Sequence, residues 1–234
     1  MLVAANPVSS SRVDAVVTQL RQGVFEGRYP PGTALRELVL ARELSVSQAT
    51  VREALQRLEH TGLVTRKPNL GSTVTRLSPK DVQERVELRA ILEVQAAWQA
   101  SRRMKETEFA ELERRLETLD AAVAANSYYE SAQADLEFHR YIWECSGNDT
   151  LRRHLELLVI PLFAFISILR SQGLERLVTV VEAHRPLISA LESGNPERIR
   201  TEFEKGATSA YSLFIGNGPE RVVLSAFGFL ESGA

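Results

Sequence analysis

The chain has 234 residues, of which 44% are apolar and 25% are charged, and its formal net charge is -2. This length and apolar content are sufficient for two domains, each with its own core. The single cysteine, Cys145, excludes an internal disulfide and zinc sites built from clustered cysteines, and it fits a reducing cytoplasm. The first residues lack a basic start followed by a long apolar run, so we expect no secretory signal.

The charge is distributed unevenly along the chain. Residues 1–77 contain ten Lys or Arg and six Asp or Glu, a net charge of +4, whereas the remainder contains eighteen and twenty-four, a net charge of -6. A basic N-terminal part suits binding to nucleic acid phosphates. Chance clustering of surface charge is the alternative explanation. It is the weaker one, because the basic excess coincides with the helix-turn-helix pattern in these residues.

The first 77 residues carry the pattern of a helix-turn-helix. After a polar tail over residues 1–11, a first helix is predicted over residues 12–27, ending at Gly27. A short amphipathic run over residues 35–44 and the turn Ser45-Val46 precede a second helix that starts after Ser47 and ends before Gly62. Its inward face has helical spacing, with Val51, Ala54, Leu55 and Leu58. Its other face is polar, with Gln48, Thr50, Arg52 and Gln56.

A β-hairpin with a basic tip is predicted directly after these helices. Residues 63–67 and 72–76 are β-prone, and they flank the turn-rich segment 68–71. A helix-turn-helix followed by such a hairpin is a winged helix, in which the second helix enters the DNA major groove and the wing contacts neighbouring phosphates.

The run from Leu44 to Leu58, with Pro31-Gly32 before it and Gly62-Leu63-Val64 after it, resembles the DNA-binding head of the GntR superfamily of bacterial regulators. The resemblance implies that Arg52 contacts operator DNA, that the start of its helix reads bases, and that a glycine-containing wing enters the minor groove. The family usually has Arg-Thr where Gln48-Ala49 stand here, and a Gln favours adenine where an Arg favours guanine. The candidate DNA contacts are Ser47, Gln48, Thr50, Arg52, Arg57, Lys67 and Gly71.

From residue 81 onward the chain shows long amphipathic runs and no convincing strand. Helices are predicted over residues 79–103, 107–126, 128–145, 149–171, 174–193 and 196–215, which indicates an antiparallel all-α bundle of six to seven helices. We therefore expect a winged-helix domain over residues 1–77 and a helical domain over residues 78–234. The most apolar run, 155–169, is short for a membrane span and contains Pro161, so we interpret it as a buried core helix. The tail 216–234 is apolar enough to dock at an unspecified place.

Three residues of the helical part have a spacing that suits a metal ion. Asp135 and His139 lie four apart and therefore share a helix face, and His184 follows on a later helix. Taken alone, such residues are more often surface groups or hydrogen-bonded core residues than ligands.

The order of four segments resembles the all-helical FCD effector domain of the FadR branch of GntR regulators: 87–93, Asp135 to His139, 146–148 and His184. This resemblance implies a divalent ion, zinc or nickel, at the base of a pocket for a small carboxylate. Gly206 stands where a fourth ligand, a histidine, is expected, so affinity for the ion should be lower. Some members of the branch lack the metal and bind larger effectors such as acyl-CoA. Arg89 is a candidate partner of the effector anion, or else part of an ordinary surface or interhelical salt bridge.

These features together predict a cytoplasmic, ligand-responsive transcription regulator, most often a repressor in this family, that binds a palindromic operator as a homodimer and has no membrane partner. Two other classes stay open on the sequence alone. One is a metal-dependent hydrolase that uses Asp135, His139 and His184 and carries an accessory DNA-binding head. The other is an architectural DNA-binding protein without an effector, which a densely packed apolar interior beside Asp135 would support.

Overall fold

The structure is a computed structural model that describes residues 7–67, 71–171, 178–209 and 211. The predicted wing tip at 68–70 and the tail 216–234 lie outside these residues. The chain divides into two compact units, residues 1–76 and residues 77–234, and each unit has its own buried core.

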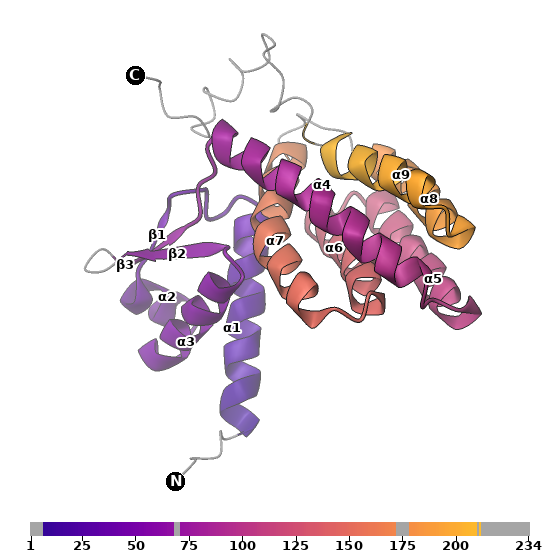
Figure 1. The fold of residues 1–234 in the computed structure, drawn as a ribbon. Coiled ribbons are helices and arrows are strands. Elements are labelled where there is room, and N and C mark those ends of the chain that lie inside the picture. The colour runs from indigo at the N-terminus through magenta and orange to yellow at the C-terminus, as the bar shows by residue number, and fades with distance from the viewer. Residues whose placement is uncertain (1–6, 68–70, 172–177, 210, 212–234) are drawn as a thin grey trace. The chain divides into compact units, whose positions relative to one another are not determined.

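Within its described residues, the N-terminal unit contains three helices, α1 (Pro7–Phe25), α2 (Glu37–Glu43) and α3 (Gln48–His60), and three strands (Figure 1). The helices α1 and α2 both pack on α3. Its core is a set of side chains that are at most 3% exposed: Val13, Val16, Leu20, Val24, Leu40, Val51, Ala54, Leu55 and Leu58. The prediction of a non-helical tail up to residue 11 was wrong for residues 7–11, because Pro7 suits the first position of a helix and the following serines do not stop it.

The strands of this unit form one small antiparallel sheet in the order β1-β3-β2. The predicted hairpin is confirmed as β2 (Val64–Lys67) and β3 (Gly71–Val74), with Val64 opposite Val74 and Lys67 opposite Gly71. The two-residue strand β1 (Ala34–Leu35) was not predicted. It forms through backbone pairing with Thr73 and Ser72, which no local sequence pattern reveals.

The second unit contains six helices among the described residues, as the bundle prediction required: α4 (Pro79–Ser101), α5 (Glu106–Ala124), α6 (Tyr128–Cys145), α7 (Asp149–Ser171), α8 (Val178–Ser193) and α9 (Pro196–Ser209). Helix α4 starts at a capping box formed by Ser78 and Asp81, and it packs along α6, α7, α8 and α9 (Figure 1). This central position lets α4 place side chains beside residues from four other helices.

Helix α7 is the most buried element of the bundle. It is 23 residues long, longer than the apolar run 155–169 inside it, and by length and composition it is apolar enough to cross a membrane. Burial of 72% of its apolar window nevertheless confirms a core helix. Pro161 lies inside α7 and Pro186 inside α8, and both helices continue through their prolines.

Candidate functional site

Helix α3 presents a polar face from a firmly anchored backbone. Ser47 is its N-cap: the Ser47 hydroxyl accepts a hydrogen bond of 3.1 Å from the Thr50 amide, and the two hydroxyls lie 2.8 Å apart. Val51, Ala54, Leu55 and Leu58 are buried on the opposite face, as predicted. Gln48 and Arg52 are therefore exposed on the side of the helix that points away from the core.

A carboxylate from α2 holds both of these exposed side chains. Glu37 accepts a hydrogen bond of 3.0 Å from Nε2 of Gln48 and one of 2.8 Å from Nη2 of Arg52. The Nε atom of Arg52 donates to the same carboxylate, at 3.1 and 3.2 Å from its two oxygens. The pKa of Glu37 is lowered, chiefly because of the hydrogen bond from Arg52. No local sequence pattern singles out Glu37, since its partners lie eleven and fifteen residues away.

The remaining candidate DNA contacts differ in what surrounds them. Arg57 is partly buried and ion-pairs with Asp14 of α1 at 2.5 Å and with Glu53 at 2.8 Å, so it also joins α1 to α3. Gly71 begins β3 with φ +79°, and a Cβ atom there would meet nothing within 4 Å. The side chain of Lys67 lies outside the described part of the structure.

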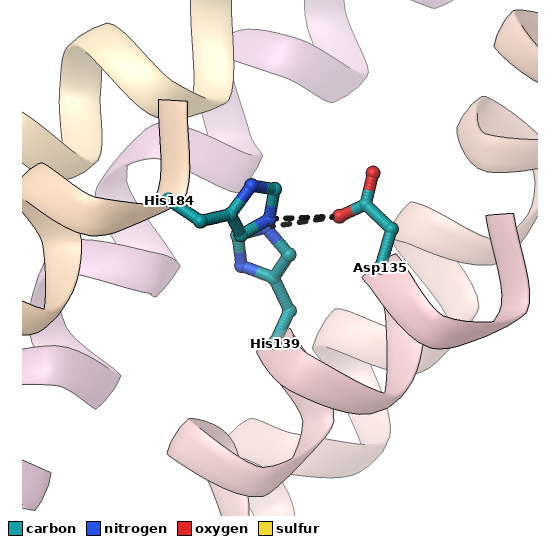
Figure 2. A group of neighbouring side chains, drawn as sticks. All are labelled: Asp135, His139 and His184. Carbon is teal, nitrogen blue, oxygen red and sulfur yellow. Dashed lines mark hydrogen bonds and ion pairs between the residues drawn. The ribbon is translucent and has the colours of Figure 1, made fainter. Parts of the chain in front are cut away.

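The three candidate metal ligands converge inside the helical unit. Asp135 and His139 lie one turn apart on α6, and His184 reaches them from α8 (Figure 2). Both imidazole Nε2 atoms face one carboxylate oxygen, Oδ1 of Asp135: His184 at 3.0 Å and His139 at 3.5 Å. All three side chains are buried, and one ligand atom from each lies within 4.8 Å of the others.

This arrangement is compact enough to hold a metal ion. In a zinc site with bonds of about 2.0–2.1 Å, neighbouring ligand atoms lie roughly 3.3 Å apart, close to the two distances measured here. The far ring nitrogen of His139, Nδ1, lies 3.4 Å from Oε1 of the buried Glu93. Metal-bound histidines commonly direct their second nitrogen toward a carboxylate in this way. The donor set and its surroundings therefore suit a divalent ion.

Burial and neighbouring charges set the protonation of the cluster. Burial lowers the pKa of His139 to about 4, which the charge of Glu93 only partly opposes. Burial works against ionisation of Asp135, but the charge and hydrogen bond of His184 outweigh it and lower the pKa to about 2. At neutral pH Asp135 is thus a carboxylate and His139 a neutral imidazole, the states in which each binds a metal.

Arg89 belongs to the same buried network. Its Nε donates to Oε1 of Glu93 at 3.2 Å, and its guanidinium lies 5.2 Å from the ring centre of Phe163 and 5.9 Å from that of Tyr211. Arg89 is 3% and Glu93 is 1% exposed, so this is an interior pair within α4. Oε2 of Glu93 and Nδ1 of His139 have no hydrogen-bond partner among the described residues. Glu93 ends the segment 87–93 that resembles the FCD domain, and its place in the sequence does not by itself indicate this role.

Arg89 and the three candidate metal ligands line one cavity of about 350 Å³. Its wall includes Arg89, Asp135, His139, Arg170, His184 and Gly206. Gly206 contributes no ligand atom, and a Cβ there would meet a methyl of Leu187 at 3.3 Å. The cavity is polar beside Asp135, which counts against an architectural protein with a solid apolar interior.

Comparison with known families assigns both units. A model of bacterial regulatory proteins of the gntR family matches residues 12–74, and a model of the FCD domain matches residues 84–204. The chain belongs to the GntR family, in the group with a C-terminal FCD domain. This GntR/FCD protein is therefore a transcription regulator, and the alternative of a metal-dependent hydrolase was wrong.

Relatives of this GntR/FCD protein are regulators as well. A probable D-xylose utilization operon transcriptional repressor of Paenarthrobacter nicotinovorans is 31% identical over 191 residues, 81% of each chain. The uncharacterized HTH-type regulator YdhC of Bacillus subtilis is 31% identical over 180 residues, 76% of this chain and 80% of its own. The solved structure of E. coli McbR/YncC has the same fold, with a TM-score of 0.73 at 22% identity, covering 87% of this chain and 96% of that one.

Proposed function

We propose that the chain is a cytoplasmic repressor whose residues 1–77 bind operator DNA and whose residues 78–234 bind a small carboxylate through a divalent ion. The observation that carries this proposal is the cavity in which Asp135, His139, His184 and Arg89 meet. A buried anion-binding site in a unit joined to a helix-turn-helix is the arrangement expected of a ligand sensor.

In the N-terminal unit, α3 enters the major groove and its exposed face reads bases. Arg52 and Gln48 are the proposed base-reading residues, with Gln48 directed to adenine. Ser47 and Thr50, at the start of α3, lie near the backbone phosphates that approach a helix N-terminus. Arg57, Lys67 and Gly71 complete the contacts that we propose, the last two from the wing.

In the helical unit, Asp135, His139 and His184 would hold zinc or nickel, and Gly206 supplies no fourth protein ligand. The ion supplies a positive charge that attracts a carboxylate oxygen when it is bound. Among the described residues Arg89 donates to Glu93 through Nε, and it lines the cavity, so its other N–H groups are available to bind the same anion. One relative is named as a probable repressor of a D-xylose utilization operon. That name describes the relative, but it makes sugar acids a suitable first set of ligands to test on this chain.

We further propose that the protein works as a homodimer, because two heads on a palindrome bind with the affinity that one head lacks. An exposed apolar face suits this role: Leu88 is 47% and Ile91 66% exposed on α4, and Leu157 on α7 is 43% exposed. These positions are neighbours, since Arg85 of α4 donates hydrogen bonds to the carbonyls of Leu157 and Leu158.

Selection of binding sites from random duplex DNA, followed by titration, tests the DNA-binding assignment. The wild-type protein should enrich a palindrome, and Arg52→Ala should lower affinity for it by 100-fold or more while the fold is retained. Arg200→Ala is the matched control, because it removes an exposed arginine of α9 in the helical unit. Failure of the wild-type protein to enrich any sequence at low salt would end the proposal.

Addition of zinc with a panel of sugar acids and small dicarboxylates tests the sensor. An effector must bind the DNA-free arrangement more tightly in order to release the operator. We expect release by at least one carboxylate for the wild-type protein and none for His139→Ala. Equal release from both proteins would contradict the assigned site.

A further inference from the structure

Glu37 is the residue through which the two proposed base-reading side chains are connected. It is the first residue of α2, and its side chain is 21% exposed, whereas that of Arg52 is 50% exposed. Its carboxylate accepts from Gln48 and, along one edge of the guanidinium, from Nε and Nη2 of Arg52. A carboxylate with three donors from two residues is a built contact rather than an incidental surface ion pair.

These hydrogen bonds leave a defined set of groups for DNA. Because a carboxylate only accepts, Glu37 fixes the Gln48 amide with its nitrogen toward α2, which leaves one N–H and the carbonyl oxygen free. Arg52 is held by the edge that contains Nε, so the opposite edge, with Nη1 and the second hydrogen of Nη2, faces outward. The remaining N–H and carbonyl oxygen of Gln48 match the N7 and N6 groups of adenine. The remaining edge of Arg52 matches O6 and N7 of guanine.

We propose that Glu37 is a specificity-determining positioning residue, which orients Gln48 and Arg52 together so that α3 discriminates an adenine and a guanine as one unit. This proposal rests on the DNA-binding function proposed for α3. Glu37 gains no contact with DNA in this role, and its negative charge repels phosphates. Its charge therefore lowers affinity for non-specific DNA, while its positioning of Gln48 and Arg52 raises affinity for the correct bases by more than the charge costs.

A masking role is the competing interpretation of the same contacts. If Glu37 only neutralised Arg52, its removal would raise affinity for specific and non-specific DNA by the same factor. If Glu37 positions the two side chains, its removal should raise non-specific affinity and lower specific affinity. The ratio of the two affinities separates these roles.

The test compares Glu37→Gln and Glu37→Ala with Glu43→Gln, a control that removes the same charge from an exposed position on the same helix. Each protein is titrated with the selected operator, with variants that carry single base-pair changes, and with a scrambled duplex, at several salt concentrations. We expect the ratio of operator to scrambled affinity to fall at least 10-fold for both Glu37 variants and less than 3-fold for Glu43→Gln.

Two further results are expected from positioning. The base-pair preference assigned to Gln48 should flatten in Glu37→Ala, and adding Gln48→Ala to that variant should then change affinity by less than 3-fold. An unchanged ratio, or equal gains on both duplexes, would overturn the proposal. If Arg52→Ala loses binding but Glu37→Gln keeps the ratio of operator to scrambled affinity, the positioning role alone is contradicted. If the wild-type protein selects no operator, the proposed function itself is contradicted. If Glu37→Ala melts at a lower temperature than the wild type, the affinity ratio of the near-isosteric Glu37→Gln variant decides between positioning and masking.

Discussion

Nε2 of His184 lies 3.0 Å from Oδ1 of Asp135, although the two residues are 49 positions apart in the chain. This contact joins α8 to α6 and brings a third candidate ligand to the pair that Asp135 and His139 form on one helix (Figure 2). The candidate ligand atoms already lie close together, so little reorganisation would oppose the metal binding that we propose.

Metal binding should depend on these three residues. We expect the wild-type protein to bind one zinc or nickel ion per chain and to melt at a higher temperature with the metal, by linkage of about 2.7 kcal/mol at an ion concentration of 100 Kd. His184→Ala should abolish both effects. Elemental analysis after dialysis and thermal unfolding measure them, with His154→Ala, an exposed histidine on α7, as the control. Stoichiometric metal in His184→Ala would contradict the site.

The free energy of unfolding should fall much further when one partner of the Arg89–Glu93 pair is replaced than when both are replaced. Glu93→Leu leaves a buried guanidinium without its carboxylate, and we expect a loss of about 3–5 kcal/mol in the free energy of unfolding. The double variant Arg89→Met with Glu93→Leu replaces the pair with apolar side chains of similar size, and it should recover most of that loss. Urea unfolding measures each, and equal destabilisation of the single and double variants would argue against a coupled pair.

The stability of the metal-free protein should fall between pH 6.5 and about pH 4. The pKa of His139 in the folded protein is lowered to about 4 from 6.5, because the ring is buried. Below pH 6.5 the unfolded chain takes up a proton that the folded chain does not, so the contribution of His139 is complete above pH 6.5 and decreases on acidification by up to about 3 kcal/mol. Urea unfolding as a function of pH should show this slope in wild type and in His154→Gln, and a markedly smaller one in His139→Gln. The lowered pKa of Asp135 acts only below its usual 3.8, outside this range.

The exposed apolar face on α4 and α7 should control assembly. A charge at Ile91, which is 66% exposed, would be buried unpaired in a dimer built on this face. We expect Ile91→Glu to be a folded monomer with operator affinity reduced at least 100-fold. Light scattering coupled to size-exclusion chromatography measures the mass, and Ala110→Glu, an exposed position on α5, should stay dimeric. A dimeric Ile91→Glu would move the interface elsewhere.

Much of the secondary structure can be predicted from local sequence patterns. The spacing of Val51, Ala54, Leu55 and Leu58 together with Ser47 as cap predicts α3 correctly, because helix periodicity and capping involve residues only three or four apart. Gly62 has φ +73°, as its place after α3 implied. The same logic placed Asp135 and His139 on one face of α6.

Local patterns are enough to predict the helices, the hairpin and the types of side chain available for chemistry, since each depends on neighbours in the chain. Which of those side chains meet is set by packing in three dimensions: Glu37 with Arg52, Glu93 with His139, and His184 with Asp135. Such contacts depend on how helices pack across long stretches of chain, and a carboxylate that becomes a buried partner has the same local pattern as one that stays on the surface.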